Sequence, residues 1–415
     1  MVKTAELSHG LLGTTLQWED VEEIAREGAP KCVDLKIREE KSIKPLAEGV
    51  GLQSLLGIAE VEWEAKEGNS YPKKFALKIG SPVALLQALE AQAAKLPPDV
   101  AANISDEFIK FLPPCHNSEI YFYNYINSRH LDILPQYYFG REIQISKENG
   151  HYSKGCIAIE LVEGVHTLSP LENFSDAQML QVLEQLAKLQ VEFIDMDEEQ
   201  RRKAPHQGLA GLYSNFKDWF LQLNNTLMAH FPDPEMQKLT ETFATTLPDV
   251  ITADDLDLVP AKLGNMKKVL VHGDLWSANI MWDEEGNLKK LIDFQMTHFG
   301  LAATDLARVF NTCLTPENRR ENKEKYLEKY HVFLEKFCKE EGKEVPFDLE
   351  QLKTTYNMAY PRVSAYLLPA LTAVLEKVVT MPDIPAKPII LGSFIAKVKG
   401  IYQDIIEYHE NRPEI

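Results

Sequence analysis

Three strongly hydrogen-bonding side chains interrupt an apolar stretch of the chain, VLVHGDLWSANIMW at residues 269–282. His272, Asp274 and Asn279 stand between runs of β-type apolar residues, and an acidic turn at 283–286 follows. A second run, LKKLIDF, begins after this turn and places Asp293 near its end. Buried polar groups require hydrogen-bond partners. The chain is therefore expected to form short strands here, joined by a hairpin-like turn, that bring these side chains together.

The spacing HxDxxxxN, followed fourteen residues later by an aspartate, is that of a kinase catalytic loop and the magnesium-binding aspartate behind it. Magnesium prefers hard oxygen ligands, which the amide of Asn279 and the carboxylate of Asp293 provide. Asp274 would accept the proton of an attacking hydroxyl and orient that hydroxyl. His272 has no acid–base duty in this scheme. It would brace the loop through hydrogen bonds to the backbone or to Asp293.

A simpler interpretation competes with this one. An HxDxxxxN match also arises by chance, and a buried Asp with an Asn can simply satisfy the backbone groups of a turn. The strand-borne IDF at the right distance favours the catalytic interpretation, because both pieces are flanked by β-type apolar residues. That interpretation requires phosphate-binding residues in the first part of the chain.

The first part of the chain supplies candidates for nucleotide binding. Gly49 and Gly51 precede a strand, in a loop whose backbone could approach phosphates closely. Ser54 stands where the third glycine of a GxGxxG loop would fall, so a plain turn fits equally well. Lys78, in the strand KFALKIG, is either an exposed edge lysine or the group that grips the α- and β-phosphates of a nucleotide. Glu119, on the helical stretch NSEIYFYNYI, could pair with Lys78 and fix its position.

Two further segments have an expected role. IAIELVEG, at 157–164, leads from the first part of the chain into the second, where a kinase hinge lies. The backbone from Glu160 to Val162 could hydrogen-bond adenine, whereas the Glu160 carboxylate is not required there and is expected to be solvated. Asp305, in AATDLARVF, is expected to open a helix as its N-cap. It could instead hold amides of the catalytic loop, and the two roles are compatible.

Length and composition limit the class of protein. A chain of 415 residues exceeds the size at which one core usually keeps growing, so two lobes are expected. The net charge of -18 disfavours nucleic acids and anionic membranes as partners. Five scattered cysteines without a CxxC pair suggest neither a disulfide framework nor a zinc cluster. The first residues do not predict a secretory signal, and the longest apolar run, at 366–375, is shorter than an expected membrane span. We expect a cytoplasmic protein with no obligate protein partner.

Hydrophobic periodicity divides the chain near residue 163. Before that point strands are expected at 55–65, 73–80, 134–145 and 155–162, the first two pairing antiparallel, and helices at 81–96 and on both sides of the prolines in 105–127. Beyond it, helices are expected at 175–195, 213–230, 235–247, 317–340, 348–379 with a break near Pro361, and 389–411. The expected fold class is α+β, with a sheet-rich N-terminal lobe at 1–163 and a larger helical C-terminal lobe at 164–415.

Lys78, Glu119, Asp274, Asn279 and Asp293 together resemble the site of the protein-kinase-like superfamily. The stretches HGDLWSANIMW, IDFQ and SEIYFY are similar to the CHK kinase-like, or ecdysteroid kinase-like, family, which is related to choline kinases and aminoglycoside phosphotransferases. The resemblance implies a bilobal protein-kinase-like fold with a nucleotide-binding N-terminal lobe and an acceptor pocket in the C-terminal lobe. It also implies ATP, Mg²⁺ and a small-molecule alcohol substrate; some insect members act on ecdysteroid hydroxyls.

Two features favour a small acceptor over a protein. Protein kinases carry a lysine two residues after the catalytic aspartate, where this chain has Trp276. The charge of the transition state must then be met by other groups, such as Lys78 and the metal. Eleven residues separate Asp293 from Asp305, which leaves no room for a long activation segment.

The sequence does not select the acceptor among steroid-like, amino alcohol and xenobiotic compounds. Three tyrosines of the second lobe could line its pocket, although core packing is the more ordinary role for each of them: Tyr356, Tyr360 and Tyr366. The alternative function is a catalytically weak kinase-fold protein that binds or senses a small lipophilic ligand. The missing third glycine suggests this alternative, and the complete set of magnesium residues argues against it.

Overall fold

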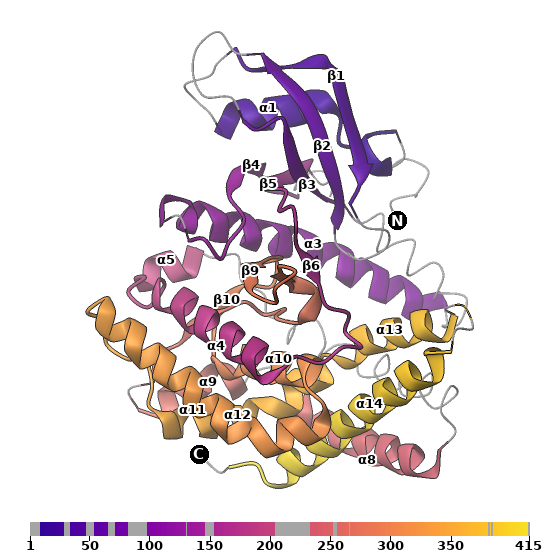
Figure 1. Cartoon of the computed structure of the whole chain (residues 1–415), viewed down its shortest axis with the longest axis vertical. Coiled ribbons are helices and arrows are strands. Elements are labelled where there is room, and N and C mark those ends of the chain that lie inside the picture. The colour runs from indigo at the N-terminus through magenta and orange to yellow at the C-terminus, as the bar shows by residue number, and fades with distance from the viewer. Residues whose placement is uncertain are drawn as a thin grey trace. The chain divides into compact units, whose positions relative to one another are not determined.

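The computed structural model describes residues 9–28, 34–46, 54–64, 71–81, 98–129, 131–145, 153–203, 233–251, 255–264, 266–380, 382 and 385–413. The chain divides into two compact units, Met1–Gly164 with Ala204–His206 and Val165–Lys203 with Gln207–Ile415. The predicted fold class, α+β, is confirmed: the first unit contains a five-stranded antiparallel sheet and the second is mostly helical (Figure 1). The helices expected at 81–96 and 213–230 lie outside the described residues.

The sheet of the first unit has the strand order β1-β2-β3-β5-β4. Its strands are β1 (Lys36–Pro45), β2 (Ser54–Glu64), β3 (Lys74–Gly80), β4 (Tyr137–Arg141) and β5 (Gly155–Ile159). The helical elements are η2 (Leu11–Gly13), α1 (Trp18–Gly28), α3 (Pro98–Ile126) and η3 (Asn127–Arg129). The predicted hairpin is confirmed as β2 and β3, which pair antiparallel over seven residues. The sequence did not predict α1 or β1.

The alternation of side chains along β3 gives the sheet two different faces. Phe75, Leu77 and Ile79 belong to a hydrophobic core that also contains residues of α1, β2, β4 and β5. Successive residues of a strand point to opposite faces. Lys78 therefore points away from this core, as the alternation in the sequence predicts.

Helix α3 runs without interruption through Pro113 and Pro114, although the sequence predicted helices on either side of them. A proline removes a backbone donor and usually kinks or ends a helix. Here buried side chains lie on both sides of the prolines, among them Phe111, Leu112 and Cys115. Tertiary packing on both sides of the prolines is the physical reason why the helix continues.

The second unit contains three short antiparallel strand pairs and nine described helices. The strands are β6 (His166–Thr167), β7 (Val269–Val271), β8 (Ile280–Trp282), β9 (Leu288–Leu291) and β10 (His298–Gly300). The helices are α4 (Asp176–Val191), α5 (Glu198–Lys203), α8 (Pro234–Val250), α9 (Asp255–Lys262), α10 (Ala303–Cys313), α11 (Pro316–Glu340), α12 (Leu349–Ala365), α13 (Leu368–Thr380) and α14 (Lys387–Glu410), with the single turn η4 (Ser277–Asn279). β7, β8 and β9 flank the polar motif, as predicted, whereas β6 and β10 were not predicted.

Side-chain caps define where several of these helices begin. Ser175 and Asp348 form capping boxes at the starts of α4 and α12. Thr315 caps α11, which opens with Pro316 at its first position. Such side chains accept hydrogen bonds from backbone N–H groups that have no partner inside the helix. A proline at the first position loses no helical bond.

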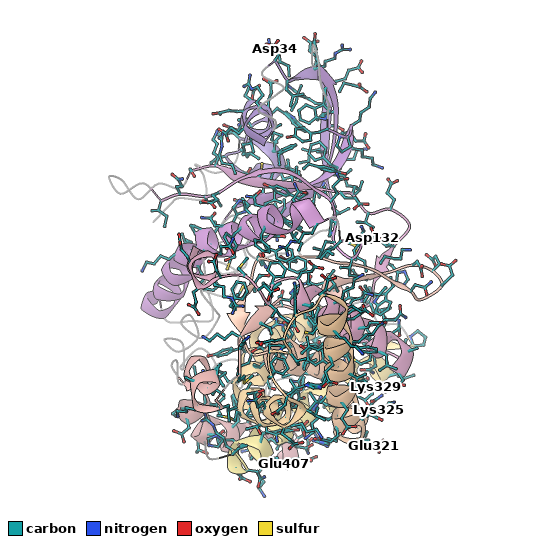
Figure 2. All side chains as sticks on the ribbon, turned by 90° about the vertical axis from the view of Figure 1, so that its left-hand side faces the viewer. Asp34, Asp132, Glu321, Lys325, Lys329 and Glu407 are labelled. Carbon is teal, nitrogen blue, oxygen red and sulfur yellow. The ribbon has the colours of Figure 1, made fainter. Side chains whose placement is uncertain are left out.

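Amphipathic faces pack these helices against one another: α11 on α4, α10 on α12, α12 on α14, and α14 on α8. Figure 2 shows Glu321, Lys325 and Lys329 spaced along one exposed face of α11. The opposite face buries Tyr326 and Tyr330. This pattern is the usual one for a helix that covers a core.

The break predicted near Pro361 is wrong. Pro361 lies inside α12, and the chain interrupts its helix at residues 366–367, before α13 begins at Leu368. Pro369 is the second residue of α13, a position where a missing backbone N–H costs no helical hydrogen bond. No helix in the described part of the chain is long and apolar enough to cross a lipid bilayer.

A buried polar network joins four helices of the second unit. Nε and Nη2 of Arg319 donate to Oδ2 of Asp404 at 2.9 and 2.5 Å, and Nε of Arg320 donates to Oδ1 at 2.7 Å. The Tyr360 hydroxyl lies 2.5 Å from Oδ1 of Asn311 and 3.2 Å from Oδ2 of Asp404. The side chains of Arg319 and Asp404 are 2% and 3% exposed. Their charges therefore depend on each other.

We expect Asp404→Asn to lower the free energy of unfolding by about 3 kcal/mol, because the buried Arg319 guanidinium loses its counter-charge. Urea denaturation followed by circular dichroism measures the change. Asp233→Asn is the matched control, since it breaks the pair with Lys399, in which the aspartate is 40% exposed, and asparagine still caps α8. An equal loss in both variants would contradict the importance of the buried network.

Candidate active site

Two glycines of the first unit form a slot that receives a histidine from α3. Gly80 and Gly155 are paired across β3 and β5, and a Cβ on either would lie 2.9 Å from the ring of His116. The His116 ring binds the carbonyl of Arg141 through Nε2, at 2.9 Å. A carbonyl only accepts, so Nε2 carries the proton. The missing side chains of the two glycines allow α3 to approach the sheet one turn before Glu119.

Lys78 and Glu119 form a buried ion pair within the first unit. Lys78 Nζ lies 2.5 Å from Glu119 Oε2, and the two side chains are 10% and 1% exposed. Lys78 lies in the middle of the sheet, because β3 pairs with β2 on one side and with β5 on the other. Two charges removed from water need close pairing to offset desolvation. The pair therefore holds the ammonium group of Lys78 in a fixed direction.

In the second unit, Asp305 of α10 holds the start of the loop 272–279. Asp305 Oδ2 accepts a hydrogen bond from the backbone N–H of His272 at 2.7 Å, and Oδ1 accepts one from Gly273 at 2.9 Å. Burial raises the pKa of the Asp305 carboxyl, whereas the two amides that it accepts and the charge of Arg308 oppose this rise. Both oxygens are engaged, so the loop backbone is fixed relative to α10.

His272 links two parts of the motif through its ring. Nδ1 accepts a hydrogen bond from the backbone N–H of Asp274 at 3.2 Å, and Nε2 donates to the carbonyl of Ile292 at 3.0 Å. An N–H group can only donate, so Nδ1 is unprotonated and the tautomer follows from the bonding. The ring also packs on Phe294, with centroids 4.5 Å apart. His272 thereby ties the loop to the residues on either side of Asp293.

The loop requires a glycine at position 273. Gly273 has φ +81°, in the left-handed region, and a Cβ there would lie 2.3 Å from the carbonyl oxygen of Met296. Other residues are strained in this conformation, and the backbone oxygen leaves no space for a side chain. The turn that places Asp274 therefore depends on this glycine.

Asp293 has a backbone conformation that non-glycine residues rarely adopt, with φ +67°. The backbone N–H of Ile292 donates to the carbonyl of Asn279 at 3.1 Å, which brings Asp293 beside the end of the loop. Asp293 Oδ2 accepts a hydrogen bond from Gln295 Nε2 at 3.4 Å. Backbone strain of this kind gathers at functional sites, where the surroundings impose it.

Both oxygens of the Asp274 carboxylate are engaged. Asn279 Nδ2 donates to the Asp274 carbonyl at 2.8 Å and to Oδ2 at 3.1 Å. Arg308 Nη2, from α10, donates to Oδ1 in an ion pair in which the arginine and aspartate side chains are 9% and 15% exposed. The two bonds arrive from different elements. They fix the plane of the carboxylate.

The donor atoms around Asn279 suit a small hard cation. Its amide nitrogen is turned toward Asp274, so its Oδ1 is directed away from that carboxylate. Together with a carboxylate of Asp293 this gives the oxygen ligands that Mg²⁺ prefers, and Mg²⁺ on a nucleotide needs one or two protein carboxylates or amides. Among the residues that the structure describes, no group of three or more His, Cys, Asp or Glu could hold a metal. The residues present fit Mg²⁺ bound to phosphate.

The structure describes only one of the three residues predicted for the phosphate loop. Gly49 and Gly51 fall outside the described residues. Ser54 is the first residue of β2, where it pairs with Gly80 of β3. The loop with Gly49 and Gly51 is thus not tested, and its role in phosphate binding stays a prediction.

At the expected hinge, Glu160 is bonded rather than simply solvated, which corrects the expectation for its carboxylate. Oε2 accepts a hydrogen bond from the backbone N–H of Gln136 at 3.1 Å, and the Glu160 N–H donates to the Gln136 carbonyl at 2.8 Å. These bonds tie the end of β5 to the start of β4. Val162 is half-buried, two residues further on.

The expectation that Asp305 is an N-cap is wrong. The N-cap of α10 is Ala302, and Asp305 lies in the first turn, from which it reaches the loop amides. Arg308 was not predicted as a site residue, although its spacing from Asp305 in the sequence could have indicated it. Residues three apart lie on the same helix face, so a helix that holds the loop through Asp305 also presents Arg308 to it. The three candidate pocket tyrosines, Tyr356, Tyr360 and Tyr366, are buried.

Comparison with known families places this arrangement among its relatives. The model of the family DUF1679, described as "Uncharacterized oxidoreductase dhs-27", matches residues 4–413. The chain belongs to the DUF1679 family. Among the curated proteins, the chain is similar to the "Uncharacterized kinase-like protein D1044.1" of Caenorhabditis elegans, which is 27% identical over 300 residues, 69% of this chain and 73% of that protein.

A second Caenorhabditis elegans relative, "Uncharacterized oxidoreductase dhs-27", is 26% identical over 301 residues, 69% of this chain. The aligned residues make up 35% of the length of that relative. Choline kinases and aminoglycoside phosphotransferases occur among the similar solved structures. The choline kinase of Cryptosporidium parvum Iowa II is 12% identical, with 92% of this chain and 94% of that chain covered and a TM-score of 0.48. The predicted relation to kinase-like proteins is confirmed.

We expect the stability of the first unit to depend on the neutral form of His116. Burial lowers the pKa of His116 from 6.5 to about 4, so the unfolded chain takes up the proton first as the pH falls. The stabilisation is present above pH 6.5 and is lost as the pH falls toward 4. The free energy of unfolding of the wild type should fall by about 3 kcal/mol over this range relative to that of His116→Gln, whose side chain does not titrate. Denaturant unfolding at several pH values measures this, and parallel profiles would contradict it.

Proposed function

We propose that this protein is an ATP-dependent phosphotransferase that acts on a hydroxyl group of a small molecule. The observation that carries the proposal is the bonding around Asp274, whose carboxylate is held at both oxygens in a loop fixed by Asp305. The buried Lys78–Glu119 pair supports it, because a strand-borne lysine fixed by a helical glutamate is the phosphate-binding device of kinases. The kinase-like relative D1044.1 is consistent with the proposal.

In the proposed reaction, Asp274 orients the acceptor hydroxyl and receives its proton. A bond forms between the acceptor oxygen and the γ-phosphorus of ATP, and the bond from that phosphorus to the β,γ-bridging oxygen breaks. ADP leaves with the electron pair of that bond. Asp274 later returns the proton to solvent. Positioning and electrostatic stabilisation supply most of the catalysis of phosphoryl transfer, so the fixed carboxylate suits the reaction.

The other residues have binding roles in this proposal. Lys78 would contact the α- and β-phosphates, and Glu119 would keep its ammonium group in place. The backbone from Glu160 to Val162 would bind adenine, and the loop with Gly49 and Gly51 would lie over the phosphates. His272 and Asp305 would maintain the loop.

Asn279 and Asp293 would hold Mg²⁺, since their oxygens are of the kind that this ion prefers. When bound, Mg²⁺ supplies positive charge that offsets the charge of the phosphates. The left-handed backbone of Asp293 and the bond from Ile292 to Asn279 keep the two side chains at neighbouring positions. The backbone thus holds the two proposed Mg²⁺ ligands near each other.

A small acceptor fits the segment after Asp293 better than a protein does. Strand β10 and helix α10 follow within ten residues, so the described chain offers no long segment on which a peptide could dock. The acceptor classes considered are steroid-like compounds, amino alcohols and xenobiotics. A catalytically weak protein that binds or senses a lipophilic ligand is the second candidate, on the observation that Ser54 replaces the third glycine.

Redox chemistry on a dinucleotide finds no support in the described residues, despite the oxidoreductase description of the family model and of one relative. Dinucleotide-binding folds use parallel strands with a crossover helix. Every strand pair that the structure describes is antiparallel. The same description stands for the family model that matches residues 4–413 and for a relative of which this chain covers 35%.

A phosphotransfer screen tests the proposal. The protein is incubated with Mg²⁺, γ-labelled ATP and, separately, choline, ethanolamine, an aminoglycoside and an ecdysteroid. We expect one acceptor class to become labelled and Asp274→Asn to lower kcat by about 10³-fold, because general-base catalysis contributes on that order. The apparent Kd for Mg·ATP, measured by thermal shift, should stay within about threefold.

Asp195→Asn is the matched control, since it removes an exposed carboxylate of the same unit and should leave the rate unchanged. Asp293→Asn should instead weaken binding of Mg·ATP. Unchanged transfer by Asp274→Asn would show the proposed base to be wrong. A thermal shift with Mg·ATP without label on any acceptor would favour the ligand-binding candidate.

A further inference from the structure

One face of α10 reaches three separate parts of the second unit. Asp305 binds the start of the loop 272–279, Arg308 binds Asp274, and Asn311 Nδ2 donates to Ser364 Oγ at 2.8 Å. Residues spaced by three share a helix face. The helix is buried along its whole length from Asp305 to Cys313. α10 is thus a rigid support with one anchor in the loop and another in the polar network of the helices.

The guanidinium group of Arg308 is directed at Asp274. Its side chain is 9% exposed, and Nη2 donates to Asp274 Oδ1. Its Nε–H is buried and has no hydrogen-bond partner among the residues that the structure describes. Within the described residues, Arg308 is therefore placed to meet one carboxylate.

The loop that contains Asp274 has no cation of its own. Residues 272–279 read HGDLWSAN, without lysine or arginine, and Trp276 stands two residues after Asp274. A mostly buried carboxylate is costly without a counter-charge. Arg308 supplies that charge from a helix 34 residues away in sequence.

We infer that Arg308 is a positioning residue for the proposed phosphoryl transfer, holding the Asp274 carboxylate in the orientation that receives the acceptor hydroxyl. The inference rests on the proposed function of Asp274. Asn279 holds Oδ2 and the backbone carbonyl of Asp274, so Arg308 on Oδ1 completes the restraint of the carboxylate plane. Each carboxylate oxygen retains a second lone pair, which can accept the hydroxyl of an acceptor. Arg308 acts through Asp274 and touches neither ATP nor the acceptor.

The inference predicts a specific kinetic pattern for Arg308→Gln. Release of the carboxylate should lower kcat by about 100-fold, because misplacement of a reacting group by about 1 Å costs on that order. The KM for Mg·ATP should change less than about threefold, since Arg308 does not contact the nucleotide. Arg308→Lys retains the positive charge without the planar guanidinium fork and should recover part of kcat.

A double-mutant cycle tests the inference with Mg·ATP as the probe. Release of ADP is measured with the acceptor that became labelled in the screen. A second measurement, without any alcohol, follows ADP released by transfer to water. The proteins are the wild type, Arg308→Gln, Asp274→Asn and the double variant. If Arg308 acts through Asp274, its substitution should have almost no further effect in the Asp274→Asn background. A structural role would lower kcat by the same factor in both backgrounds and would overturn the inference.

Arg362→Gln is the matched control, because Arg362 is as buried as Arg308 and its Nε donates to the carbonyl of Val250. It should lower the melting temperature without changing kcat. Unchanged kcat in Arg308→Gln, with loss of activity in Asp274→Asn, would overturn the inference and leave the proposed function intact. Unchanged activity in Asp274→Asn would overturn the proposed function itself. The thermal shift with Mg·ATP confirms that each variant folds and binds nucleotide.

Discussion

The carboxylate of Asp305 fixes the arrangement on which the second unit's polar site depends. It is completely buried, and it compensates for that burial by accepting the N–H groups of His272 and Gly273. Once these two amides are held, the left-handed turn at Gly273 sets where Asp274 begins. The same helix then brings Arg308 to the Asp274 carboxylate. One buried acid on α10 thus determines the position of a loop, and the loop determines the position of Asp274, the proposed base.

The first unit reaches an equally fixed geometry by close packing rather than by loop bonding. Two facing glycines leave a slot for His116, which lets α3 approach the sheet closely enough for Glu119 to pair with Lys78. In each unit a rigid helix orients a charged group of another element: α3 orients Lys78, and α10 orients Asp274. In phosphoryl transfer the protein does little covalent chemistry, and most of its contribution is to position the reacting groups. The two devices therefore suit the same reaction.

The sequence predicted the parts of the fold that local spacing specifies. The alternation around Lys78 predicted β3 and the face of its side chain, and the spacing from His272 to Asp293 predicted the strands around the loop. The sequence also suggested two contacts between distant residues, the Lys78–Glu119 pair and the hold of Asp305 on the loop amides, and both are present. It missed the pair of Asp274 with Arg308. Arg308 is 34 residues from Asp274, and its charge alone does not distinguish it from a surface arginine. Pro361 was misread because packing inside α12 outweighs the lost hydrogen bond. The N-cap role of Asp305 was wrong because its carboxylate accepts the loop amides, which was the alternative considered for it.

The central proposal is that Asn279 and Asp293 bind Mg²⁺ and that Lys78 binds a phosphate of the nucleotide. A crystal structure of the protein with Mg²⁺ and a non-hydrolysable ATP analogue tests it most directly. The account predicts Mg²⁺ bound by Asn279 Oδ1 and an Asp293 oxygen at about 2.0–2.1 Å, with Lys78 Nζ hydrogen-bonded to the α- or β-phosphate. A nucleotide bound away from Lys78, or a metal held by other residues, would contradict the account.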